Sequence, residues 1–317
     1  MKFANCIVIG CLAGILVSFS WASDSVTDQK KPVEFQQSSY AHLQKRVGLT
    51  RFQNRSSLLD DRLVSVTDGT LAGVLTERGK GIVPVQDTDP VFAEVRDRQP
   101  RRVSGVIDNM TLITVGRNAG LNAVVTGTIT GIRDFQEERG YWWFKEMMFF
   151  IEVHIYCSLY DTETGAKILD MTLSEKIDLP EALYRKMKAK GYIAMFPEIQ
   201  ELIISLSTEM GEEICNSMEP EPFKTFIKTI DGQQVVISSG SNAGIKSGDL
   251  FTIHDSGRLV TGKEEHQYFI AGPGTGILRI NAVQNDSASG SIMQGSITGK
   301  DACLKPIVEP SFFSKLF

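Results

Sequence analysis

The side chains in this chain that could perform chemistry include four histidines, and none of them has a second His or a Cys at metal-ligand spacing. They are His42, His154, His254 and His266. Each is predicted to be a solvated or hydrogen-bonded structural histidine. Acidic pairs such as Glu137 with Glu138 have the composition of exposed faces. The sequence therefore predicts no metal site and no paired carboxylates for acid–base catalysis.

Three glycine-rich loops resemble nucleotide or nucleophile motifs, but each departs from the motif. "GSITGKD" at 295–301 has one residue too few between its glycines, and Asp301 stands where a phosphate loop needs Ser or Thr. "GPGTG" at 272–276 lacks the strand-to-helix setting of a dinucleotide site. "GSNAG" at 240–244 is not Gly-x-Ser-x-Gly, so it is no nucleophile elbow. We predict a protein that is not an enzyme and has no cofactor.

Charge and cysteine content exclude two further classes. The net charge of −5 argues against a nucleic-acid partner, which needs clustered Lys and Arg. The basic segment "RDRQPRR" at 96–102 has no interleaved aromatic residues and is predicted to be a solvated loop. Cys157, Cys215 and Cys303 have no zinc-site spacing, and the alternating pattern around Cys157 predicts a buried thiol.

The first 22 residues read as a secretory signal peptide. Lys2 is followed by an apolar run from Cys6 to Phe19, and Ala22 suits the cleavage site. The alternative is an anchor helix, but this run is shorter than the roughly 20 apolar residues that a span needs. We expect a periplasmic protein, a flexible leader over residues 23–42, and no membrane-spanning segment in the mature chain.

Residues 43–217 alternate between strand and helix patterns. Strands are expected in 45–54, in "GIVPV" at 81–85 and in 122–135. One helix is expected to begin after Ser56 or Ser57 and to end at Gly79, with Leu59, Leu63, Val66 and Val74 on one stripe. A charged, Pro-containing loop then leads to a second helix over 109–120.

A long strand over 147–159 follows, since its odd positions are apolar and the even ones include Glu152, His154 and Ser158. "YDTETGAK" at 160–167 has hairpin-turn residues, and 167–177 is the returning strand. Helices are expected at 180–190 and 197–217, the second packing on the sheet.

After a linker at 218–222, short strands and Gly turns over 223–308 predict a small β-barrel or sandwich. A tail at 309–317 follows. The fold class is therefore α+β: an α/β sheet-and-helix domain (43–217) followed by a small all-β, barrel-like domain (223–308).

Two passages resemble known families. "AGLNAVVTGTITGI" at 119–132 with "YDTETGAKIL" at 160–169 resembles the periplasmic α/β domain of the CsgG curli-secretion family, which is similar to the N-terminal domain of TolB. "ISSGSNAGIKSGDLFTIHD" at 237–255 resembles the C-terminal β-domain of FlgT-like flagellar basal-body proteins, whose middle domain resembles residues 45–216. The matching positions of the second passage are Gly240, Gly244, Ile245, Gly248 and Asp249. They are expected to be structural turn residues: glycines with positive φ, and an aspartate bonded to turn amides.

Curli-type pores insert long membrane hairpins where residues 134–145 lie here. This loop is too short for two membrane strands, and the preceding strand carries Arg133, Asp134, Glu137 and Glu138. We therefore expect no pore.

Four consecutive aromatic residues stand at the end of the predicted hairpin: Tyr141, Trp142, Trp143 and Phe144. Successive strand residues point to opposite faces, so one sheet face cannot bury all four. Either the final helices cover part of the cluster, or it is a contact surface for a partner protein or a membrane interface.

The resemblance implies a non-enzymatic periplasmic assembly protein of a flagellar basal-body ring near the outer membrane. Its implied partners are envelope or flagellar ring proteins and further copies of itself, with peripheral outer-membrane contact. The alternatives are a curli-type secretion accessory and a cell-wall-binding envelope module.

Overall fold

The computed structural model describes residues 40–58, 60–86, 90–190, 196–255, 257–297, 299 and 302–307 of the 317-residue chain. The predicted signal peptide (1–22), most of the predicted leader and the predicted tail (309–317) lie outside them. The described residues fall in one compact unit, Gln37–Phe317. This unit contains a mixed sheet with helices and a closed barrel, so the expected α+β class with a small barrel-like part is confirmed.

One sheet in the order β3-β1-β4-β5-β6 is the centre of the α/β part. Its strands are β1 (Lys45–Leu49), β3 (Ile82–Val85), β4 (Ala123–Tyr141), β5 (Phe144–Asp161) and β6 (Lys167–Leu179), with the short β2 (Gln53–Asn54) beside β4. The neighbours β3, β1 and β4 run parallel, whereas β4, β5 and β6 form an antiparallel meander. The sheet is therefore a β-α-β unit extended by two long hairpins.

Helices cover the two faces of this sheet unequally. Helices α1 (Asp61–Arg78) and α5 (Pro197–Met218) pack on one face, where they share a core with the odd-numbered residues of β5. Helices α2 (Pro90–Asp97) and α3 (Asn109–Asn118) cover the other face around Val124 and Tyr160. α4 (Glu181–Lys190) lies against the distal part of the sheet, where Tyr184 contacts Phe149 with ring centroids 4.7 Å apart.

The long strand confirms the expected period of two, because Ile151, Val153, Ile155, Cys157 and Leu159 are fully buried. Its other face was expected to be polar and outward. That is wrong for Ser158, whose side chain is buried and bonded to Tyr156 and Asp170.

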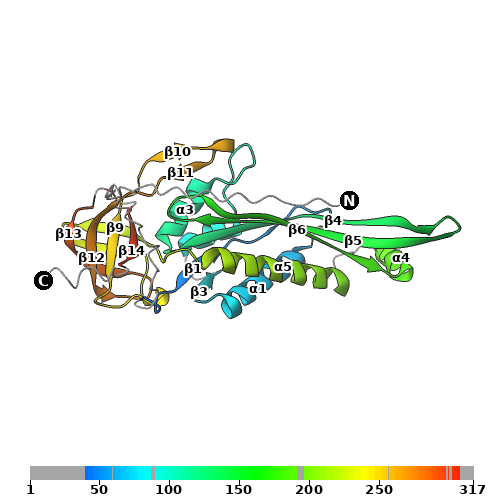
Figure 1. The fold of residues 1–317 in the computed structure, drawn as a ribbon, viewed down its shortest axis with the longest axis horizontal. Helices are drawn as coiled ribbons and strands as arrows, with labels where there is room; N and C mark the ends of the chain where they lie inside the picture. Colours follow the sequence, from blue (N-terminus) through cyan, green and yellow to red (C-terminus); the bar gives the residue numbers. More distant parts are fainter. Residues whose placement is uncertain are drawn as a thin grey trace, which may run out of the picture. The chain divides into compact units, whose positions relative to one another are not determined.

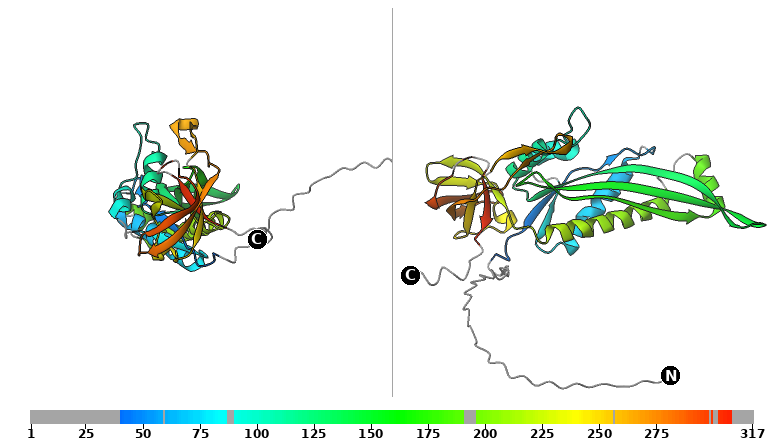
Figure 2. Two further views of the ribbon diagram at one scale, coloured as in Figure 1. Left: turned by 90° about the vertical axis from the view of Figure 1, so that its left-hand side faces the viewer. Right: turned by 45° about the horizontal axis from the view of Figure 1, so that its top comes forward.

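β4 and β5 extend farther than the sequence predicted. Residues 134–145 are not a loop: β4 continues to Tyr141, β5 begins at Phe144, and these two residues are paired. β6 stops pairing with β5 at Phe149, so residues 137–148 form a two-stranded ribbon, which we call the distal ribbon. Its end reaches past α4 in Figure 1 and in the right-hand view of Figure 2.

Two further expectations about the helices need correction. Asp60, not Ser56 or Ser57, caps α1, because its side chain accepts a hydrogen bond from the main-chain N–H of Arg62. Val66 is only half-buried, and Leu59 lies outside the described residues. The segment expected to be a Pro-containing loop holds α2, which begins at Pro90 and buries Phe92 and Val95.

The C-terminal part closes into a six-stranded barrel in the order β12-β13-β8-β7-β14-β9. Its strands are β7 (Thr225–Asp231), β8 (Gln234–Ile237), β9 (Leu250–His254), β12 (Gly274–Val283), β13 (Ala288–Gly295) and β14 (Cys303–Pro306). A separate hairpin, β10 (Leu259–Thr261) with β11 (Gln267–Phe269), leaves it between β9 and β12. The predicted linker, 218–222, begins at the last residue of α5, Met218, and ends before β7 starts at Thr225.

Close contacts join the barrel to the α/β part. The main-chain N–H of Phe269 donates to Thr164 O at 2.8 Å, and Asn122 Nδ2 donates to Lys224 O at 3.1 Å. Gly120 has a φ of +66°, and a Cβ at this position would collide with Ser238 O of the barrel. Tyr40, in the predicted leader, donates its hydroxyl to Leu250 O at 3.1 Å. Among the helices that the structure describes, none combines the length and apolar character that a membrane span requires.

Candidate functional site

The four aromatic residues form the end of the distal ribbon, and we call them the aromatic tip. Tyr141 is 91% exposed, Trp142 83%, Trp143 73% and Phe144 76%. The indole rings of the two tryptophans contact each other with centroids 5.1 Å apart. The alternative in which the final helices cover the cluster is therefore wrong, because little besides the neighbouring ring shields these side chains.

The turn that presents the tip has an unfavourable backbone for its sequence. Only Trp142 and Trp143 separate the paired residues Tyr141 and Phe144, and Trp142 has a φ of +37°. Two-residue turns with positive φ at their first position favour Gly there, since a side chain in this region costs about 1 kcal/mol or more. The fold thus tolerates local strain at the point where it exposes an indole ring, a pattern common at functional sites.

Charged residues lie directly behind the tip and are paired with one another. Lys145 Nζ lies 3.0 Å from Glu138 Oε2, and Arg139 Nη2 lies 2.7 Å from Glu137 Oε2. The Arg139 guanidinium also stacks over the Phe150 ring, 4.8 Å from its centroid. The distal ribbon therefore has an aromatic end and a charged collar of both signs.

Replacing Trp142 and Trp143 together by Ser is expected to change the free energy of unfolding by less than about 1 kcal/mol. Both side chains are exposed, so the loss is limited to their mutual contact. Chemical denaturation followed by circular dichroism measures the change. Ile151→Ala is the matched control in the buried part of the same hairpin, with an expected loss of about 2–5 kcal/mol. A comparable loss in the double Trp variant would show that the tip supports folding.

The predicted turn residues lie in the loop between β8 and β9, far from the aromatic tip in the chain. Gly244 and Gly248 have positive φ, at +81° and +95°. Gly240 does not; it is close to Gln284 O, with which a Cβ would collide. Asp249 Oδ2 accepts from Lys246 N at 2.8 Å and lies 3.2 Å from His42 Nε2. These contacts shape a turn and create no reactive group.

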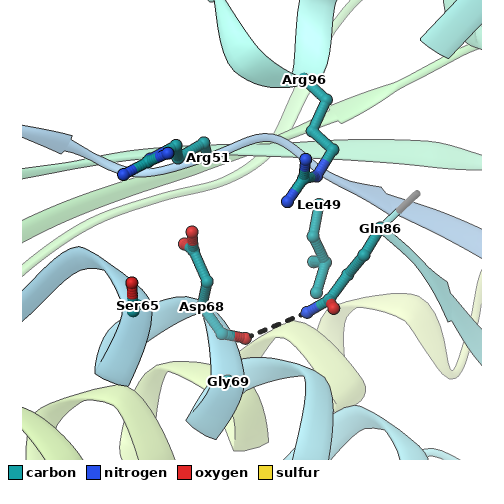
Figure 3. A pocket seen from close by; sticks show the side chains of 7 residues that line it. All are labelled: Leu49, Arg51, Ser65, Asp68, Gly69, Gln86 and Arg96. Carbon is teal, nitrogen blue, oxygen red and sulfur yellow. Dashed lines mark hydrogen bonds between the residues drawn. The ribbon is translucent and has the colours of Figure 1, made fainter. Parts of the chain in front are cut away.

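Sequence reasoning missed a crevice where the parallel strands β1 and β3 end. The chain leaves β1 toward α1 on one face of the sheet and leaves β3 toward α2 on the other. Crevices at such points are common ligand sites in open α/β sheets. The cavity holds about 240 Å³ and is lined by Leu49, Arg51, Ser65, Asp68, Gly69, Gln86 and Arg96. Figure 3 shows the Asp68 carboxylate pointing into the space between the two arginines.

Asp68 is the unusual group of this crevice. Burial raises its pKa to about 6, although the Phe52 N–H, donating at 3.2 Å, and the charges of Arg96 and Arg51 act in the opposite direction. A signal was present in the sequence, because Asp68 falls on the helical stripe of Val64, Leu71 and Leu75, which are all buried. A carboxyl on a buried stripe marks either a polar cluster or a site.

A second missed feature is a buried ion cluster at the β5–β6 turn. Lys224, with a side chain only 4% exposed, has its Nζ 2.5 Å from Asp161, 2.8 Å from Glu221 and 3.6 Å from Glu163. Lys305 pairs with Glu163 at 2.7 Å. Burial lowers the pKa of Lys224, but the carboxylates of Asp161 and Glu221 together more than offset this, so the pKa lies above its usual value. The cluster connects the turn to the barrel and has a structural role.

The remaining candidate groups do not form a centre. Cys157, Cys215 and Cys303 are free thiols, and burial raises the pKa of Cys157 and Cys303 well above the usual range, which makes them unreactive. His154 lies 3.2 Å from Glu152 and His42 from Asp249. Within the described ranges, no three His, Cys, Asp or Glu side chains are grouped to hold a metal ion.

No family model matches the chain, and no curated protein does so either. Solved structures give weak likenesses. The hypothetical protein CT253 from Chlamydia trachomatis is 12% identical with a TM-score of 0.35, over 56% of this chain and 99% of that one. The PelC dodecamer from Paraburkholderia phytofirmans is 11% identical with a TM-score of 0.29, over 52% and 85%. Lipoprotein GNA1162 from Neisseria meningitidis is 14% identical with a TM-score of 0.28, over 48% and 97%. TM-scores in this range assign no function.

Proposed function

We propose that this chain is a non-enzymatic docking protein of the bacterial cell envelope that acts in the periplasm through its aromatic tip. The single observation that carries the proposal is the exposure of four consecutive aromatic side chains at the end of a ribbon. Isolated two-stranded ribbons are at best marginally stable in water. The exposed tryptophans at its end, one with a strained backbone, therefore add little to the stability of the fold. They are well suited to contact a binding partner.

The specific machine that we propose is a flagellar basal-body ring near the outer membrane, with envelope or ring proteins and further copies of the chain as partners. This part rests on the resemblance of residues 45–216 and 237–255 to FlgT-like proteins, together with the predicted signal peptide. The crevice of Asp68 and the buried Lys224 cluster are not needed for it.

A deletion strain complemented with variants tests this proposal. The Trp142→Ser/Trp143→Ser variant is expected to weaken assembly by about 2 kcal/mol or more, roughly 30-fold in affinity, since buried aromatic anchors dominate interfaces. Recruitment of the tagged protein to basal bodies and the presence of outer rings in electron micrographs are the measurements. The exposed barrel residue Met293, replaced by Ser, is the control and should leave both unchanged. Intact outer rings and normal motility in the deletion strain itself would refute the flagellar assignment.

The crevice favours a second candidate, a cell-wall-binding envelope module. Arg51 and Arg96 can face a carboxylate and Asp68 can accept from an amine, and cell-wall peptides carry both groups. A pull-down with purified cell wall, repeated with Arg51→Ala, distinguishes this candidate from the docking protein. Retention that depends on Arg51 would support it, whereas no retention would exclude it.

A further inference from the structure

We propose that the aromatic tip inserts into the headgroup region of a phospholipid bilayer. This inference rests on the proposed docking function, because it identifies the surface on which the protein docks. The tip consists of two residue pairs, Tyr141 with Phe144 and the turn residues Trp142 and Trp143. At about 3.4 Å per residue the tip is about 7 Å deep. Amphipathic segments at membrane interfaces lie with their apolar face roughly 5–10 Å deep in the headgroup and acyl boundary. The depth of the tip falls within this range.

The charges behind the tip begin where lipid headgroups would lie. Lys145 directly follows Phe144, and its partner Glu138 is on the adjacent strand, 3.0 Å away. Arg139 and Glu137 form the next pair at 2.7 Å. Glu146, opposite Arg139 on the adjacent strand, gives the ribbon behind the tip a net charge of −1, and Lys176 of β6 lies 3.7 Å from Glu137. The collar therefore contains both signs and little net charge, as the surface of a zwitterionic lipid layer does.

The arrangement of the aromatic rings favours lipid over a single protein partner. Strand residues alternate between faces, and all four side chains of the tip are 73% exposed or more. The apolar surface therefore surrounds the end of the ribbon instead of occupying one face of it. A surrounding medium satisfies such a surface completely, whereas one flat partner surface leaves part of it in water. Tyr and Trp also keep a polar O–H or N–H for the headgroups, which is why they are enriched at membrane interfaces.

Tryptophan fluorescence reports on the tip directly. The chain contains three tryptophans, Trp21, Trp142 and Trp143, so Trp21→Phe leaves only those of the tip. The experiment uses the full chain with this substitution and vesicles of phosphatidylcholine, with and without brominated acyl chains. We expect a blue shift of the emission on adding vesicles and strong quenching by the brominated lipid. With Trp21→Phe the predicted signal peptide has no tryptophan emission of its own, so the signal comes from the tip.

A variant that preserves both reporters tests the role of the remaining rings. Tyr141→Ser/Phe144→Ser is expected to lower the partition coefficient into vesicles at least about tenfold. Met293→Ser, at an exposed position of the barrel, is the control and should leave it unchanged. Equal partitioning of the two variants would overturn the inference.

The outcomes separate this inference from the proposed function. Absence of quenching in protein that near-ultraviolet circular dichroism shows to be folded overturns lipid insertion. If, in addition, a photo-cross-linker at Trp143 captures a protein in cells, docking stands and its partner is a protein. If quenching occurs but the deletion strain assembles normally, lipid insertion stands and the flagellar function fails.

Discussion

Replacing Lys224 by Met is expected to lower the free energy of unfolding by about 3–5 kcal/mol, because it leaves buried carboxylates without their cation. The side chain of Asp161 is 5% exposed and that of Glu163 is 8% exposed. Glu163 still has its ion pair with Lys305, so Asp161 is the carboxylate left without a cation. Chemical denaturation measures the loss. Lys228→Met, at an exposed position of β7, four residues farther along the chain, is the control and should change stability by about 0.5 kcal/mol or less.

Removing the orphaned charge should restore part of the stability. Lys224→Met combined with Asp161→Asn is expected to lose at least about 1 kcal/mol less than the sum of the single variants, since the two groups interact directly. The defect of Lys224→Met also depends on pH. In the wild-type protein the pKa of Asp161 is lowered: burial alone would raise it, but the charge and hydrogen bond of Lys224 and the hydrogen bonds of Thr164 together outweigh burial. The stabilisation by Asp161 is therefore present above its unfolded pKa of 3.8 and is lost as the pH falls below that value. The difference in unfolding free energy between the wild-type protein and Lys224→Met therefore becomes smaller at low pH. If the losses of Lys224→Met and Asp161→Asn add up at neutral pH, the ion pair between these two residues contributes nothing to stability.

Local pattern was sufficient to predict the elements that one buried face defines. The alternation in β5, the turn residues between β5 and β6, and the apolar stripe of α5 each contain their signal within one segment. Each of these elements buries residues at a fixed period, so composition and spacing determine its type.

Elements without a buried face were missed or shortened. The distal ribbon is mostly exposed, and its charged and aromatic residues stand in consecutive blocks, "EER" and "YWWF", which show no apolar period. Helix α2 has only eight residues and two buried side chains, Phe92 and Val95, too few for a periodic signal. Its Pro90 indicated a loop to us, although Pro is common at the first position of a helix.

The candidate sites differ in the same way. The aromatic tip is contiguous in the chain, so the sequence could predict it, but its exposure required the register of β4 and β5. The crevice joins residues of β1, α1 and α2 with Arg51 and Gln86, which follow β1 and β3, and Lys224 is 63 residues from Asp161. Only the sheet topology brings such groups together, so residue types alone could not locate them.

Asp68→Asn is expected to stabilise the protein by up to about 3 kcal/mol at pH 7 and by only about 0.5 kcal/mol at pH 4. Burial raises the pKa of Asp68 from 3.8 to about 6, a difference of roughly two units at about 1.4 kcal/mol each. Because the unfolded chain releases this proton first, stability falls as the pH rises from about 4 to 6 and then stays constant. Asn removes the ionisation and can still accept the hydrogen bond of the Phe52 N–H.

The matched control is Asp61→Asn on the same helix, where the side chain is 91% exposed. It should lose a few tenths of a kcal/mol, because an acidic residue in the first turn of a helix is favourable. Urea denaturation of both variants at several pH values between 4 and 8 gives the two curves. If Asp68→Asn is less stable than wild type at pH 7, Arg51 and Arg96 hold the carboxylate charged, and the crevice is a closed ion cluster. If it is more stable, the fold retains a destabilising charge in an open crevice, which is the behaviour of a site kept for a ligand.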